Sequence, residues 1–136
     1  MENKIRITRG IKKIEVNDDG EFILLPVSDD GFVVRFYKLM DQISGQAEEL
    51  EKQETADITG QLDLVEKIVA IERKTKQDVE ELFGEGTCRK VFGEILPSMD
   101  LFVEFFGSIL PFFEEYKKER MRKMGKYGAD RTGSSI

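Results

Sequence analysis

Few residues of this 136-residue chain could carry out catalysis. The chain contains no histidine, the commonest general base, so Ser-His and Cys-His catalytic pairs are excluded. The single cysteine, Cys88, can form no internal disulfide, and zinc sites need more Cys and His than the chain holds. We therefore expect no enzyme activity, no metal and no other cofactor. We interpret Cys88 as a small semi-buried residue in a protein of a reducing cytoplasm.

Three short motifs resemble parts of ligand-binding loops but lack the rest of each loop. The Asp-Asp-Gly motifs at 18–20 and 29–31 are not followed by the oxygen ligands and terminal Glu of an EF-hand calcium loop. The Gly-Glu-Gly motif at 84–86 lacks the further Gly or Lys of a phosphate-binding loop. We interpret the acidic motifs as turn and helix-cap residues.

Charge is distributed unevenly along the chain, whose net charge is −6. Residues 117–136 hold an excess of Lys and Arg, so the remainder is strongly acidic. An acidic body repels phosphate, and its field opposes any attraction of the basic segment to nucleic acid. Cations near a helix C-terminus also complement the helix dipole. Nucleic acid is therefore not an expected partner.

The most apolar segment, Val91–Phe113, does not have the composition of a membrane span. It is interrupted by Glu94, Asp100 and Glu104, whereas a spanning helix needs about 20 nearly uncharged residues. A helix lying on a membrane surface is an alternative, but Glu104 and Glu114 fall on the face that would meet the lipid headgroups. We expect no membrane partner.

The first 27 residues have the period-two pattern of β-strands. Isoleucine and valine are interleaved with charged residues over 5–16, and the sequence Asn-Asp-Asp-Gly at 17–20 is typical of a tight turn. The apolar run 22–25 is the expected return strand, which Pro26 ends. The predicted product is a β-hairpin, or a short three-stranded meander if Lys4–Thr8 also pairs.

From Ser28 onward the apolar residues recur at helical spacing. Ser28 is the predicted N-cap of a first helix, whose apolar face is one-sided. A second helix is predicted from about Thr59 to Phe83, with Leu62, Val65, Ile68, Val69, Val79, Leu82 and Phe83 on its buried side. A short third helix is expected at 87–95. Pro97 ends it, and Ser98 can cap a fourth helix that reaches about Met124.

These elements predict an α+β fold that is mainly α-helical, with about four helices. We expect a single domain at residues 1–126, made of a β-hairpin region at 1–27 and a helical region at 28–126. The Gly and Ser residues after Tyr127 favour a flexible C-terminal tail at 127–136.

The fourth helix carries more apolar surface than one packing partner requires. Its apolar residues spread over roughly 200° of the helix, whereas about 100° suffices for a helix packed on one side. The helix is either buried from two sides or partly exposed for another protein or a second copy of this chain. The candidate protein-interaction residues are Phe102, Phe105, Phe106, Ile109 and Phe113. This surplus predicts a homo-oligomer.

The order of these segments resembles that of a known protein family. The segments are the hairpin sequence 13–22 followed at once by amphipathic helices, the sequence 83–93 rich in Gly and Phe, and Leu96-Pro97-Ser98 before an aromatic helix. They resemble the tail assembly chaperones of Gram-positive (Firmicute) tailed phages and prophages, over most of the chain. The motifs are loose ones of Gly, Phe and charge, and no single residue is diagnostic.

The resemblance implies a factor in the bacterial host cytoplasm that coats the hydrophobic tape measure protein and recruits tail tube subunits. It also implies that the protein is absent from the mature virion, and that a longer, frameshifted form can exist. The alternative is a small structural or joining protein of the virion, or a regulatory protein that binds a host factor. Co-expression with a tape measure protein discriminates between them, because only a chaperone should keep that protein soluble.

Overall fold

The computed structural model describes residues 3–7, 9–54 and 57–134. A two-stranded antiparallel sheet comes first, formed by β1 (Ile11–Glu15) and β2 (Phe22–Pro26). Four helices follow: α1 (Asp30–Glu51), α2 (Ile58–Phe83), α3 (Thr87–Phe92) and α4 (Met99–Ser134). The predicted α+β, mainly helical fold with strands confined to the first 27 residues is therefore confirmed.

The strands pair as a hairpin, with Ile11 opposite Pro26 and Glu15 opposite Phe22. The Asn17 side chain shapes the turn, because its Oδ1 accepts hydrogen bonds from the backbone N–H groups of Asp19 (2.9 Å) and Glu21 (3.2 Å). The predicted alternative, a meander, does not form over residues 4–7, which have no regular secondary structure; Thr8 lies outside the described residues.

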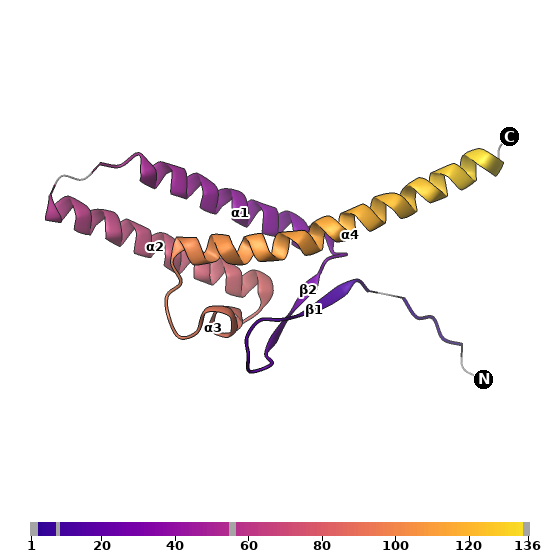
Figure 1. Ribbon diagram of the computed structural model, residues 1–136, viewed down its shortest axis with the longest axis horizontal. Coiled ribbons are helices and arrows are strands. Elements are labelled where there is room, and N and C mark those ends of the chain that lie inside the picture. The colour runs from indigo at the N-terminus through magenta and orange to yellow at the C-terminus, as the bar shows by residue number, and fades with distance from the viewer. Residues whose placement is uncertain (1–2, 8, 55–56, 135–136) are drawn as a thin grey trace.

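The three long helices, α1, α2 and α4, form most of the molecule (Figure 1). α1 and α2 run side by side, and α4 lies along them and then extends past them to the far end of the molecule. α3 and the β-hairpin lie beside the first half of α4, with α3 nearer its start (Figure 1). The core is therefore assembled where all the elements meet, near the middle of the long axis.

Several helix ends differ from their predicted positions. The N-cap of α1 is Asp29, whose carboxylate accepts a hydrogen bond from the Phe32 N–H, and not Ser28. Ser28 instead donates its hydroxyl to the carbonyl of Arg9. α3 ends at Phe92, three residues early, because Gly93 adopts a positive φ that ends the helix. Ser98 does cap α4, since its Oγ accepts from the Leu101 N–H at 3.4 Å.

The fourth helix is longer than the sequence predicts. It continues through Pro111 and runs to Ser134, so most of the segment predicted as a flexible tail at 127–136 is helical. An interior proline removes one backbone hydrogen bond and kinks or breaks a helix, and here the helix continues past it. The glycine and serine content near the C-terminus was therefore an incorrect guide to where this helix ends.

Phenylalanine rings form the centre of the core. Phe36 is fully buried, and its ring centroid lies 5.0 Å from that of Phe113, 5.7 Å from Phe106 and 6.2 Å from Phe83. Those three partners belong to α4 and to the end of α2, so one side chain of α1 joins three helices. Most of these pairs are edge-to-face or tilted, which is the favoured geometry for aromatic rings.

Two of the seven residues predicted on the buried side of α2 are exposed. Val79 is fully buried and Leu82 and Phe83 are half-buried, but Leu62 and Val65 are 56% and 53% exposed. The first turns of α2 extend beyond the end of α1, and α4 also begins further along (Figure 1). α4 does not cover Leu62 and Val65 at that end, so the prediction that both side chains are buried was wrong.

We expect Phe36→Ala to lower the free energy of unfolding by about 3–5 kcal/mol, because it leaves a cavity where three helices meet. Phe36→Leu keeps most of the side-chain volume. It should therefore lower the free energy of unfolding by less than about half of the loss that Phe36→Ala causes. Urea unfolding monitored by circular dichroism measures both. A small loss in the alanine variant would show that the ring cluster is not the centre of stability.

Candidate functional site

An apolar groove of about 310 Å³ lies between the β-hairpin, α3 and α4. We call it the hairpin groove. Its apolar wall comes from all three elements, and three polar side chains stand among the apolar ones. It is lined by Ile14, Glu15, Val16, Ile23, Val91, Phe92, Leu101, Glu104, Phe105, Ser108, Ile109 and Phe112.

The helical spacing of α4 places its groove residues. Leu101, Phe105, Ser108 and Phe112 follow one another at intervals of three or four residues and so share one face of the helix. Leu101 and Phe112 are half-buried, whereas Phe105 is 7% exposed. The floor of the groove is therefore part of the core, and its rim is accessible.

Polar contacts hold the hairpin against α3 on the other side of the groove. The Asn17 Nδ2 donates to the Lys90 carbonyl at 3.0 Å, and Arg89 forms an ion pair with Glu21 at 2.9 Å. The hydrogen bond from Arg89, with a second from Asn17, holds the pKa of Glu21 below its usual value. Both ion-pair partners are substantially exposed, so this pair orients the hairpin more than it stabilises it.

α3 itself is fixed to α2 by its buried first turn. Thr87 donates its hydroxyl to the Gly84 carbonyl at 2.7 Å and its N–H to Glu80 Oε2 at 3.0 Å. Cys88 is 1% exposed, and burial raises the pKa of its thiol to about 12. Cys88 is thus more deeply buried than the sequence predicts, on the side of α3 that faces α2.

The start of α4 is set by a buried carboxylate. Glu72 of α2 is 8% exposed, and its Oε2 accepts a hydrogen bond from the Met99 N–H at 2.9 Å. The first N–H groups of a helix lack partners within the helix, and their dipoles favour a negative charge. This contact fixes the position of α4 along α2, and with it the register of the groove residues.

The five predicted interaction residues lie in the core. Phe102, Phe105, Phe106, Ile109 and Phe113 are between 0% and 7% exposed. α4 is covered by α1 on one side and by α3 and the hairpin on the other, which accounts for its wide apolar arc. This burial agrees with the alternative in which the helix is buried from two sides, and of the five candidates Phe105 and Ile109 also line the hairpin groove.

Sequence reasoning missed the groove residues supplied by the hairpin and α3. Ile14, Val16 and Val91 are half-buried members of the wall, and nothing in their spacing relates them to α4. For the α4 side of the groove the sequence did give a weaker signal, because Leu101 and Phe112 both widen the apolar arc of α4 on the same side.

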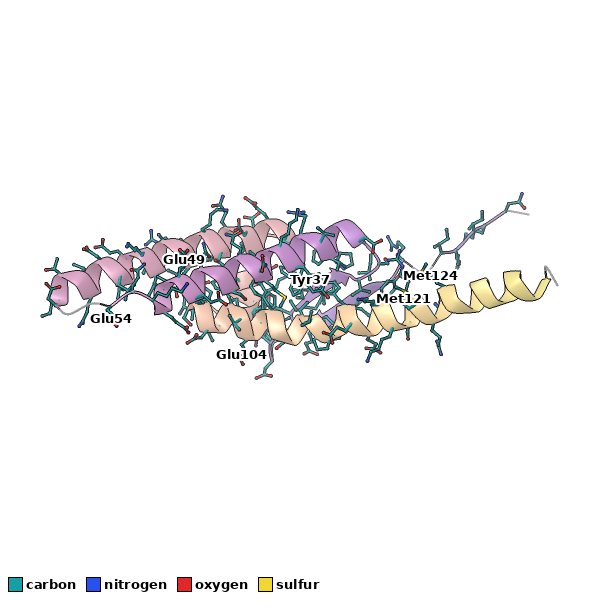
Figure 2. All side chains as sticks on the ribbon, turned by 90° about the horizontal axis from the view of Figure 1, so that it is seen from above. Tyr37, Glu49, Glu54, Glu104, Met121 and Met124 are labelled. Atoms are coloured by element: carbon teal, nitrogen blue, oxygen red, sulfur yellow. The ribbon has the colours of Figure 1, made fainter. Side chains whose placement is uncertain are left out.

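A second apolar groove, of about 540 Å³, lies between α1 and the part of α4 beyond the core. We call it the α1–α4 groove. Its walls include Val34 and Tyr37 of α1 and Met121 and Met124 of α4. Figure 2 shows Tyr37 on α1, and Met121 and Met124 further along the long axis on α4. Arg120, which pairs with Asp30 at 2.6 Å, lies at its edge.

Two further features are absent from the part of the chain that the structure describes. Among residues 3–7, 9–54 and 57–134, no three or more His, Cys, Asp or Glu side chains are grouped to hold a metal ion. In the same part of the chain, no helix combines the length and apolar character needed to cross a membrane.

Comparison with known proteins gives one match. A family model described as a family of unknown function (DUF6673) matches residues 20–135. This range begins at the hairpin turn and takes in β2 and all four helices. No curated protein and no solved structure matches the chain.

The burial of Cys88 allows a test of how stably α3, one wall of the hairpin groove, packs against the rest of the protein. At pH 8 the thiol should react with an aromatic disulfide reagent at least about 100-fold more slowly than in unfolded protein, because the thiolate is the reactive form. Asn17→Ala removes the bond to Lys90 and should speed this reaction, while Asp19→Ala in the same exposed turn should not. Equal reaction rates in the folded and unfolded protein would show that α3 does not stay packed and leaves the Cys88 thiol accessible.

Proposed function

The chain belongs to the DUF6673 family, and we propose that it acts by binding an amphipathic helix of another protein in the hairpin groove. The observation that carries this proposal is an apolar groove with an accessible rim and carboxylates among its walls. Ligand grooves are mostly apolar, with a few polar groups that fix orientation. We propose a binding function rather than an enzymatic one.

The side chains around the groove define the helix that would fit. Leu101 and Phe112 offer half-buried apolar surface about three turns apart on α4, which suits apolar residues at i, i+3/i+4 and i+7 of a partner. Glu15 and Glu104 are exposed at the groove and would attract Lys or Arg beside that apolar stripe. The proposed partner is thus a helix that is apolar on one side and basic at its margins.

A tape measure protein of a tailed phage is the partner that we propose. Its long helices present apolar stripes that must be covered before the tail is assembled. In this proposal the protein is a cytoplasmic tail assembly chaperone that forms homo-oligomers, can also recruit tail tube subunits, and leaves before the virion is complete. The groove and the sequence resemblance support this proposal independently of each other.

Co-expression with the tape measure protein tests the proposal. We expect the wild-type chain to raise the soluble fraction of that protein and to co-purify with it. Apolar burial should dominate the contact, so the complex should persist at about 0.5 M salt, where charge interactions are screened. A tape measure protein that stays insoluble would leave the virion component or host-factor regulator as the better reading.

Groove variants separate binding from folding. Leu101→Ala and Phe112→Ala change half-buried rim residues and should retain the melting temperature within a few degrees while losing most client capture. Val103→Ala is the matched control, because Val103 is an apolar α4 residue that is 52% exposed and lies outside the groove. If Val103→Ala lost the client and the two rim variants kept it, the contact would lie on another face of α4.

A further inference from the structure

Charge is separated along the long axis of the molecule. The end formed by the last turns of α1, the connection and the first turns of α2 is acidic, and we call it the acidic tip. Its charged residues are Glu48, Glu49, Glu51, Lys52, Glu54, Asp57, Asp63 and Glu66. The α4 segment beyond the core is basic and holds Lys117, Lys118, Glu119, Arg120, Arg122 and Lys123. Figure 2 shows Glu49 and Glu54 toward one end and Met121 and Met124 toward the other.

The acidic tip also carries an exposed apolar stripe. Ile58, Leu62 and Val65 lie at i, i+4 and i+7 on α2 and are 83%, 56% and 53% exposed. This spacing places all three side chains on one face of the helix. An apolar helix face of this kind is normally buried, so the tip has the composition of a surface that packs against something.

The helix dipole is unfavourable for the α1 carboxylates of the acidic tip, whereas Asp57 caps the N-terminus of α2 favourably. Glu48, Glu49 and Glu51 lie in the last turns of α1, where the dipole is negative, and the last turn holds no basic residue. Carboxylates at this position repel the helix end, whereas cations stabilise it. Cations brought by another molecule would offset this repulsion.

The α1–α4 groove offers the complementary surface at the opposite end. Its walls include the exposed apolar side chains of Val34, Tyr37, Met121 and Met124, and Lys117 lies beside them. Lys118 borders an adjoining hollow of α4 that is also lined by Lys117 and Met121. Methionine side chains are flexible and adapt to the shape of a partner. The groove is thus apolar with a basic edge, as the tip is apolar with acidic surroundings.

We propose that the acidic tip of one copy of this chain binds in the α1–α4 groove of a second copy. Apolar residues then meet apolar residues, and carboxylates meet lysines. Because the two surfaces differ, each bound copy presents a fresh groove or tip, and the contact repeats head to tail into an open chain or a ring. This inference goes beyond client binding and does not depend on it, because the two grooves share no lining residue.

Charge reversal with exchange tests the pairing on the purified chain alone. The tip variant is Glu49→Lys/Glu51→Lys/Glu54→Lys, and the groove variant is Lys117→Glu/Lys118→Glu. Wild type should show a weight-average mass that rises above 15.6 kDa with concentration in sedimentation velocity. Each variant alone should associate at least about tenfold more weakly, because like charges then meet in the contact.

An equimolar mixture of the two variants should regain association, because the reversed tip of one matches the reversed groove of the other. The matched control is Asp18→Lys/Glu85→Lys/Glu94→Lys, which reverses three exposed carboxylates outside the tip and should associate as wild type does. Raising the salt concentration to about 0.5 M should weaken wild-type association.

Misfolding would not explain loss of association in the tip variant. Lysines at the end of α1 complement its dipole, so the melting temperature should stay equal or rise. A wild-type chain that is monomeric at all concentrations in low salt would overturn the proposal. So would a mixture of folded variants that stays monomeric, or a groove variant that associates as strongly as wild type.

Discussion

The arrangement of the helices depends on the burial of aromatic rings around Phe36. Eight of the ten phenylalanines form one connected set of ring contacts, which spans α1, α2, α3 and α4. A chain of this size has few ways to bury so many large side chains, so this set determines where the helices cross. The hairpin joins the same core through Ile23, Leu25 and Val27. Both grooves lie at the margins of this core, where the fully buried side chains are bordered by half-buried ones.

The helical periods and breakers were enough to predict the fold. The change of apolar period at Ser28 separated the hairpin from the helices, and Gly84, Gly86 and Pro97 marked the breaks between α2, α3 and α4. The helix ends were less accurate, because Ser28 and Asp29 are both good caps and only the backbone decides between them. The extension of α4 to Ser134 was missed because local composition does not report the continuity of a helix.

The candidate site was predicted only in part. The wide apolar arc on α4 pointed to the correct helix, and Phe105 and Ile109 do line the hairpin groove. A single sequence cannot show which side of an apolar arc a neighbouring element covers, so the interaction candidates also included Phe102, Phe106 and Phe113, which lie in the core. The converse error occurred at Leu62 and Val65, where a helical stripe looked buried but has no third layer over it.

That missing third layer also gives the molecule a gradient of local stability. At the tip, the first turns of α2 extend beyond the end of α1 and lie away from α4, whereas the centre is held from several sides (Figure 1). Helix ends with few buried contacts unfold locally more often than the whole protein unfolds. The backbone amides of the tip should therefore exchange with solvent first. A surface of low local stability gains the most order when it is covered. Covering the tip would therefore stabilise α1 and α2 against local opening along their length. This stabilisation would extend to the core through Phe36 of α1.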